Sequence, residues 1–289
     1  TPGASDSVSV GGDLSLGGAV TLNVANAGSF GPGVYRLVDY GGSLTGAGSL
    51  SLGGLPGGST VLLQNLSADK RFNLLNTTGL TLNFWNADGL ASPVQSGGGT
   101  GTWSTTSPVW TDAAGTVTVP MQPQPGFAIF GGAPGTVTID KTGGAVQALG
   151  MQFTSGGYTL AGDALTLLGI GGAKAEIRVG DGSAASSGFV ATVNSAIAGS
   201  AGITKTGAGT LVLLMAVARL PEVTRELVKR GRDASTPVAV ICDGTTDRQQ
   251  VLVSTLGQVA QDAADRGVRP PAVVVIGEVV RLREALGPV

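Results

Sequence analysis

The stretch Ile203–Met215, ITKTGAGTLVLLM, divides the sequence into two parts that differ in composition. The 213 residues before Leu214 contain 43 of the 49 glycines but only 17 of the 36 Asp, Glu, Lys and Arg residues, and the last 76 residues contain the other 19. A step of roughly threefold in charge density indicates a domain boundary here. Thr210–Leu213 suits both parts, because the same residues can close a last β-strand rung or begin the sheet of an α/β lobe.

Short runs in which apolar and polar residues alternate, separated by glycine, fill the first part. The runs consist mainly of Val, Leu and Thr, and breaks such as Gly-Gly and Pro-Gly favour turns. Repeated short strands with so little charge predict a β-solenoid, in which each turn of chain buries its inward Leu and Val side chains on the next. We expect two segments, residues 1–97 and 98–213, with SGGGTGTW (96–103) as a flexible link.

Helix and strand signals alternate in residues 214–289, which predicts a small α/β lobe. Leu220–Gly231 has proline near its start, acidic residues early, basic residues late and glycine at its end, as expected for a helix. A second helix is expected to begin at a cap formed by Ser254 or Thr255 and to end at Gly267. The other expected elements are strands at Pro237–Ile241, Gln249–Val253 and Ala272–Ile276, and a closing helix at Glu278–Leu286.

Charge and residue usage exclude several classes of function. The net charge of −2 gives neither part the basic excess that a phosphate backbone requires, so we expect no nucleic-acid partner. The sequence contains no histidine, which excludes His-based catalysis and most zinc and iron sites. We assign no catalytic or metal-binding residue. The longest apolar run, Leu211–Ala218, is too short to span a bilayer. The chain begins Thr-Pro without an initiator Met, which predicts a fragment that lacks its start and any export signal.

Three features have both a structural and a functional interpretation. Cys242, the only cysteine, ends an apolar strand beside Asp243, an environment that raises a thiol pKa and favours a buried structural cysteine over a nucleophile. Asp181-Gly-Ser favours a hairpin turn over a calcium site, because one carboxylate is far short of the oxygen ligands that calcium takes. Trp103 and Trp110 favour packing on the solenoid over a sugar-stacking surface.

Several phrases in the first part resemble the autotransporter-associated β-strand repeats of bacterial surface passengers. The resemblance covers most of residues 7–213 and implies a right-handed β-helix at the cell surface or secreted, which meets a surface ligand or a host cell. The phrases are Gly33–Gly42, Gly79–Trp85, Trp103 and Trp110, FGGAPGTVTI (130–139), GMQF (150–153), GYTLAGDALTL (157–167) and TKTGAGTLVL (204–213).

Residues 211–289 closely resemble the C-terminal lobe of uroporphyrinogen-III C-methyltransferase, an enzyme of sirohaem and cobalamin synthesis. The resemblance implies a homodimeric cytoplasmic parent whose S-adenosylmethionine contacts fall on Met215 and Gly244. In that family the glycine-rich cofactor loop and the catalytic positions lie in an N-terminal lobe that has no match here, so we expect no cofactor to bind. The phrases that carry the resemblance are Leu211–Val217, Thr236–Ile241, Gly244–Gln249 and Val275–Arg283.

The expected fold class is therefore mainly β, with a right-handed β-helix-like solenoid followed by a small, incomplete α/β lobe at 214–289. The expected function is that of an autotransporter passenger-type adhesion segment fused to a truncated, inactive methyltransferase lobe. The alternative is an S-adenosylmethionine-dependent uroporphyrinogen-III C-methyltransferase that acts through its C-terminal lobe in the cytoplasm.

Overall fold

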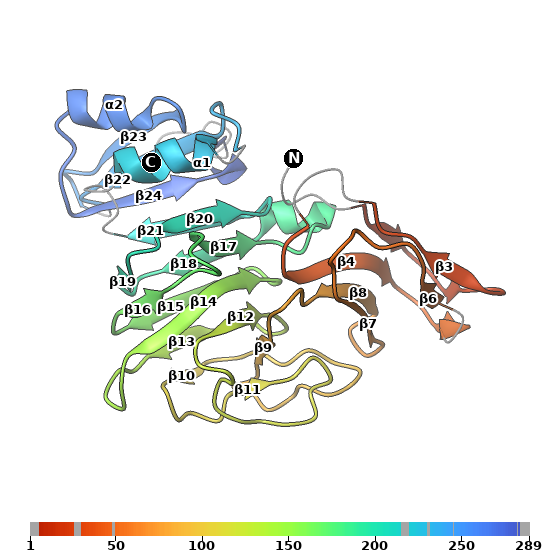
Figure 1. Ribbon diagram of the computed structural model, residues 1–289. Helices are drawn as coiled ribbons and strands as arrows, with labels where there is room; N and C mark the ends of the chain where they lie inside the picture. The colour runs from red at the N-terminus through yellow and green to blue at the C-terminus, as the bar shows by residue number, and fades with distance from the viewer. Residues whose placement is uncertain are drawn as a thin grey trace.

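The computed structural model describes residues 6–25, 30–47, 50–214, 220–229, 232–244, 246–281 and 283. Most regular structure in these residues is β-strand. Figure 1 shows an N-terminal region in red and orange, a stack of strands in yellow and green beside it, and a blue lobe at one end of the stack. We call the second and third of these the strand stack (residues 82–214) and the lobe (residues 220–283). Within the described ranges, no helix is long and apolar enough to cross a membrane.

The N-terminal region contains two turns of chain that pair in parallel at a constant separation of 30 residues. Val8 pairs with Val38, Leu14 with Leu44 and Val20 with Leu50. We call residues 8–24 and 38–54 the N-terminal coil. Its strands are β1 (Val8–Val10), β2 (Leu14–Ser15), β3 (Val20–Leu22), the end of β4 (Gly33–Tyr40), β5 (Leu44–Thr45) and β6 (Leu50–Leu52).

Antiparallel pairing follows the coil. Strands β4, β8 (Arg71–Asn76) and β7 (Val61–Leu66) lie side by side, each antiparallel to its neighbour. This differs from the uniform solenoid that the sequence predicts for residues 1–97. The cause is the short connection Ser67–Lys70, in which Lys70 has a φ of 57°. A connection of this length folds β8 directly back on β7, whereas a parallel neighbour needs a crossover of a dozen or more residues.

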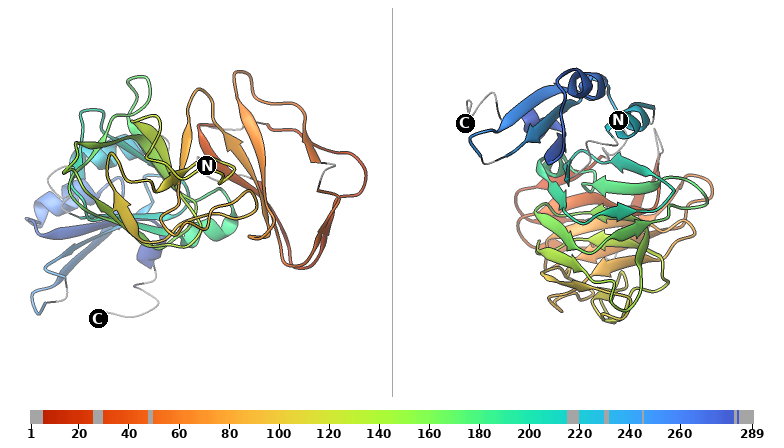
Figure 2. Two further views of the ribbon diagram at one scale, coloured as in Figure 1. Left: turned by 90° about the horizontal axis from the view of Figure 1, so that it is seen from below. Right: turned by 90° about the vertical axis from the view of Figure 1, so that its left-hand side faces the viewer.

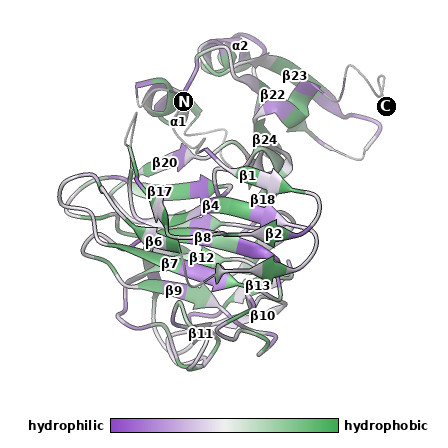
Figure 3. Cartoon of the chain, turned by 90° about the vertical axis from the view of Figure 1, so that its right-hand side faces the viewer, coloured by the Kyte–Doolittle hydropathy of each residue, from purple (hydrophilic) through white to green (hydrophobic). Residues whose placement is uncertain are grey.

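The strands of the strand stack belong to two sheets, and most pair in parallel, as the right-hand view of Figure 2 shows. From β12 (Gly126–Phe130) on, each strand of the first sheet is separated from the next by one or two strands of the second. In one sheet, Thr159 pairs with Thr136 before it and with Thr192 after it. Figure 3 shows hydrophobic and hydrophilic residues next to one another along the strands. The elements are β9 (Leu82–Trp85), β10 (Gly101–Trp103), β11 (Trp110–Thr111), β12 (Gly126–Phe130), β13 (Thr136–Ile139), β14 (Val146–Phe153), β15 (Tyr158–Gly162), β16 (Leu165–Leu167), β17 (Ala175–Val179), the 3-10 helix η2 (Ala184–Gly188), β18 (Val190–Val193), β19 (Ile197–Ala198), β20 (Ile203–Thr206) and β21 (Thr210–Leu214).

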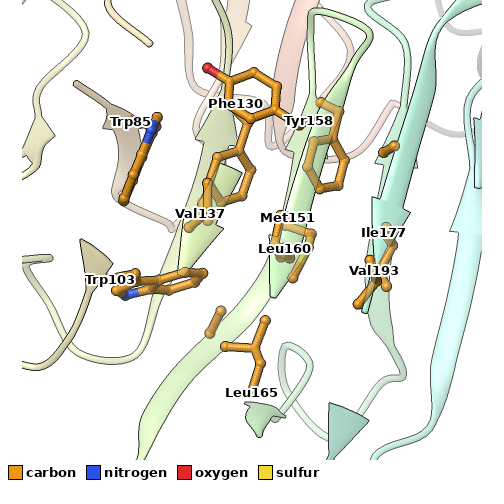
Figure 4. Packing of buried hydrophobic residues seen from close by; sticks show 14 of the residues in the cluster. Trp85, Trp103, Phe130, Val137, Met151, Tyr158, Leu160, Leu165, Ile177 and Val193 are labelled. Atoms are coloured by element: carbon orange, nitrogen blue, oxygen red, sulfur yellow. The ribbon is translucent and has the colours of Figure 1, made fainter. Parts of the chain in front are cut away.

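Aromatic side chains fill the core of the strand stack. Phe130 stacks on Phe153 with ring centroids 5.0 Å apart, and Trp103 meets Trp110 edge-on at 4.8 Å. Figure 4 shows Trp85, Trp103 and Phe130 converging from neighbouring strands. Trp103 and Trp110 are 1% and 0% exposed, so the packing interpretation is confirmed and no sugar can stack on their faces.

The segment 96–103 is packed, and the prediction of a flexible link is wrong. Gly97 and Gly98 are buried, and the Gly99 amide donates to the Ala133 carbonyl at 2.7 Å. The indole nitrogen of Trp85 donates to the Gly99 carbonyl at 2.8 Å. Glycine is used here because the backbone must approach its neighbours closely, since a Cβ at Gly98 would meet the backbone of Gly131 and Ala133.

The lobe follows the sequence prediction with two corrections. Ser254 and Thr255 do not cap a helix. They end a strand, because they continue the pairing with Val238 and Pro237. The predicted closing helix is, within the described residues, a 3-10 turn from Glu278 to Arg281, and most of its expected remainder lies outside them. The elements are α1 (Leu220–Lys229), β22 (Pro237–Cys242), β23 (Gln250–Thr255), α2 (Val259–Asp265), β24 (Ala272–Ile276) and η4 (Glu278–Arg281).

Strand β21 belongs to both the strand stack and the lobe. On one edge Thr192 of β18 pairs with Val212 in parallel, and on the other edge Val275 of β24 pairs with Val212 antiparallel. One sheet therefore continues from β10 through β21 to β24, β22 and β23. The prediction that Thr210–Leu213 serves both parts is confirmed.

Candidate functional site

Of the two cofactor contacts implied by resemblance, the structure describes only one, Gly244. Met215 lies outside the described residues. Gly244 follows β22 and is exposed, next to Asp243, which has a φ of 47°. A Cβ built on Gly244 would lie 3.4 Å from the Ile241 side chain. The described surroundings of Gly244 therefore form one open side of a site rather than an enclosure.

Cys242 is half-buried and has a raised thiol pKa. Burial is the main cause, and the adjacent Asp243 carboxylate adds to it. Both effects keep the sulfur protonated near neutral pH, and a thiol is a far weaker nucleophile than a thiolate. The predicted direction of the pKa shift is confirmed, and Cys242 packs against the core of the lobe.

A shallow cleft of about 30 Å³, lined by both polar and apolar residues and partly open to solvent, lies between the β7–β8 hairpin and the loops at 91–97 and 112–115. Side-chain amides cross it in series. Asn73 donates to Gln64 at 2.9 Å, and Gln64 donates to the Ala113 carbonyl at 2.7 Å. Asp112 also lines the cleft and accepts hydrogen bonds from Thr116. We call this space the hairpin cleft.

Arg71 supplies the least compensated charge in the hairpin cleft. Its Nε donates to the Asp69 carbonyl at 3.2 Å. Burial, followed by the charge of Arg36, lowers the pKa of Arg71, while Asp69, Asp39 and Asp181 oppose that shift. Arginine remains protonated in proteins, so a partly buried cation faces the cleft.

Arg36 and Asp181 form a buried ion pair behind the cleft. Arg36 Nη2 lies 2.8 Å from Asp181 Oδ2, its Nη1 pairs with Asp39, and its Nε donates to Asn73 at 2.8 Å. The Asp181 side chain is 1% exposed and accepts hydrogen bonds from Ser183. Asp181 lies at a turn as predicted, but the turn is not a hairpin, because it connects β17 to β18 of a different sheet. The carboxylate also anchors β4 to the strand stack.

A second polar contact joins the same two regions. The side-chain amide of Gln152 in β14 accepts from the Val34 amide at 2.7 Å and donates to the Val34 carbonyl at 2.7 Å. It therefore satisfies both backbone groups of Val34, as the backbone of a paired strand would. Arg178 pairs with Glu176 at 3.0 Å and lies over the Tyr35 ring at 5.0 Å. Burial lowers the pKa of Arg178, but Glu176 and Tyr35 outweigh it and raise the pKa. Gln152 lies in the phrase GMQF that carries the first resemblance, but nothing in the sequence indicates its contact with Val34, and no sequence motif marks Arg178.

The hairpin cleft is suited to binding rather than to catalysis. It offers amide, guanidinium and carboxylate groups for hydrogen bonds, but its lining contains no nucleophile beside a general base. Within the described ranges no group of three His, Cys, Asp or Glu residues is placed to hold a metal ion. The cleft is therefore a candidate site for a polar ligand.

Comparison with known proteins places the two parts in two different classes. The major part of the chain resembles an autotransporter adhesin, and residues 173–260 match the tetrapyrrole (corrin/porphyrin) methylases. The match to the methylase family begins in the strand stack, before the boundary that we expect at residue 214. Both resemblances stated from the sequence are confirmed, whereas the domain boundaries remain predictions.

Individual relatives show how much of each class is present. The adhesin BmaC autotransporter of Brucella suis biovar 1 (strain 1330) is 36% identical over 221 residues, which is 72% of this chain and 6% of the adhesin. A uroporphyrinogen-III C-methyltransferase of Sinorhizobium sp is 44% identical over 80 residues, 28% of this chain and 29% of that enzyme. The chain thus spans only a small part of each relative.

One solved structure is among the matches. The uroporphyrin-III C-methyltransferase of Thermus thermophilus, in complex with S-adenyl homocysteine, is 37% identical and covers 25% of this chain and 31% of its own, with a TM-score of 0.23. That TM-score is too low to support an argument about the fold.

Proposed function

We propose that residues 1–213 are an adhesin segment of a surface passenger and that residues 214–289 are a truncated, inactive methyltransferase lobe. The observation that carries this proposal is the 36% identity to an adhesin over 72% of the chain. A cleft without catalytic groups agrees with a binding role, in which the segment contacts a ligand on a host cell from the bacterial surface.

We further propose that the first part is a right-handed β-helix, divided at residue 97. Parallel pairing supports this in two places, namely the constant 30-residue separation of the N-terminal coil and the parallel pairing of β13, β15, β18 and β21 in the strand stack. Each turn of such a helix rests on the next, so the chain becomes a rod that holds a binding surface away from the cell.

The hairpin cleft is the proposed ligand contact, and Arg71 provides its test. Purified chain coated on a surface should retain host cells, and Arg71→Gln should reduce retention about tenfold, since a hydrogen bond to a charged group contributes about 1.5–3 kcal/mol. Lys141→Gln is the matched control, because Lys141 is 62% exposed in a surface pair with Asp163. If a coated protein unrelated to adhesins retained as many cells, the adhesion proposal would be refuted. If Arg71→Gln retained as many cells as the wild type, the proposal that the hairpin cleft is the ligand contact would be refuted.

The methyltransferase alternative is favoured by one observation, the match of residues 173–260 to the methylase family. Calorimetric titration with S-adenosylmethionine distinguishes the two. We expect no heat of binding and no methylation of uroporphyrinogen III, because the sequence has no match for the glycine-rich cofactor loop and because Gly244, the described cofactor contact, is exposed. Saturable binding together with turnover would support the enzyme, and recovery of the chain from the cytoplasmic fraction would agree with it.

A further inference from the structure

The end of the strand stack is covered by the lobe. A parallel ladder ends in a strand with one free edge, and free edges pair readily with other chains. Here that last strand, β21, has its second edge occupied by β24, with Leu211 opposite Ile276 and Leu214 opposite Val273. The lobe therefore removes the edge that the last turn of the stack would otherwise expose.

Side-chain contacts hold the lobe on the turn that precedes β21. Arg232 of the lobe donates from Nη1 to the Gly207 carbonyl at 3.0 Å. The same carbonyl accepts a hydrogen bond from Lys205 Nζ at 2.6 Å, and Lys205 also donates to the Gly209 carbonyl. Two cations from different parts of the chain thus fix one turn of the strand stack.

Gly277 allows the close approach at the end of β24. Its φ is 146°, in a region that residues with a side chain avoid, and its amide donates to the Pro237 carbonyl at 3.0 Å. A Cβ at this position would lie 2.8 Å from the Thr210 hydroxyl oxygen. Any larger residue would push the lobe away from the first residue of β21.

We propose that the lobe, having no complete cofactor site, serves as the end cap of the rod. Its partner is the free edge of β21, which it covers by sheet continuation, so that the edge strand of this sheet becomes β23 of the lobe instead of β21. The inference does not depend on adhesion, because it rests only on the pairing and contacts of β21.

Hydrogen exchange of the full-length chain tests the cap. In the wild type the amides of β21 should be as protected as those of β14 in the middle of the strand stack. Gly277→Val should speed exchange in β21 and β24 together by about tenfold or more, while β14 stays unchanged. Gly267→Val is the matched control, because Gly267 also has a positive φ of 61° but would place no Cβ against other atoms.

Self-association gives the second measurement. Gly277→Val should sediment as dimers or larger species at concentrations where the wild type and Gly267→Val remain monomeric. Should Gly277→Val not fold, Arg232→Gln, which removes the bond to Gly207 and the charge beside Lys205, should raise exchange in β21 by a smaller factor. Rapid exchange of β21 in the wild type, or loss of β24 protection while β21 stays protected in the variant, would overturn the proposal. Host-cell retention is a separate readout that the cap does not determine.

Discussion

The N-terminal coil and the strand stack use the same parallel hydrogen-bond pattern but bury different amounts of side chain. In β1–β3, β5 and β6 no residue is buried. In the strand stack, β12 is buried along its whole length, from Gly126 to Phe130. The difference lies in the side chains, since the coil offers Ser, Gly and single Leu residues where the stack offers Trp, Phe and Tyr.

This comparison separates pairing from packing. Backbone hydrogen bonds replace bonds to water and contribute little net free energy, whereas buried apolar area contributes about 25 cal/mol per Å². The strand stack should therefore contribute most of the free energy of unfolding of the chain. The N-terminal coil should depend on the strand stack for its stability. Four predictions test this division, beginning with the largest expected effect and ending with the smallest.

The largest effect is expected at the centre of the aromatic core. Phe130 is fully buried and contacts Trp110, Phe153 and Tyr158. Phe130→Ala should lower the free energy of unfolding by about 3–5 kcal/mol, because it leaves a cavity in a packed interior. Urea denaturation measures this, with Val117→Ala at a 47% exposed position as control. A loss below about 1 kcal/mol would show that the stack is loosely packed.

The next effect concerns the ion pair that joins the N-terminal region to the strand stack. Asp181→Ala removes one partner of the buried Arg36 and should lower the free energy of unfolding by about 1.5–3 kcal/mol. Arg36 keeps Asp39, which limits the loss. Asp163→Ala is the control, since its pair with Lys141 lies at the surface and contributes about 0–1 kcal/mol. Equal losses in the two variants would contradict the anchoring role.

A leucine-to-alanine substitution in each parallel ladder compares the two regions directly. Leu50→Ala in the coil should cost less than about 1 kcal/mol, because Leu50 is not fully buried. Leu160→Ala in the strand stack should cost about 2–5 kcal/mol, because Leu160 is fully buried. Denaturation midpoints of the two variants decide the matter, and similar losses would show that the coil has a core of its own.

The smallest effect is a pH dependence at Lys205. Burial, together with the charge of Arg232, lowers the pKa of Lys205 well below 10.5. Between the lowered pKa and 10.5 the unfolded chain binds more protons than the folded chain, so stability should rise with pH in that window. Below the lowered pKa the folded chain bears the full cost of charging Lys205. Lys205→Met should be less stable but lack this rise, and parallel stability curves for the two proteins would contradict the assignment.

Local patterns were sufficient for the lobe. Strand β24 has the bounds predicted from the sequence, Ala272–Ile276, because a short Val-rich run between loop residues has few alternatives. Helix α1 begins at the predicted Leu220, where proline and an early acidic residue mark its start. These signals are local in sequence, so no tertiary contact had to be known.

Local sequence patterns do not predict the polar contacts of the candidate site. Gln152 and Val34 are 118 residues apart, and nothing in either strand indicates that the two meet. Asp181 was assigned to a turn because its immediate neighbours favour one, whereas its side chain is fixed by Arg36 from a distant strand. The glycines at 96–103 failed in the same way, since composition does not distinguish a flexible glycine from one that permits close backbone contact.

The double pairing of β21 has a consequence for protein engineering. A strand that is the last member of one ladder and an inner member of another joins two folds through one sheet, so the orientation of one relative to the other is set by sheet twist together with the contacts at Gly207 and Gly277. Fusions made at such a strand keep a fixed geometry that flexible tethers cannot give. The sequence TLVLL at residues 210–214 is thus a rigid adaptor for mounting an α/β module on the end of a β-rod.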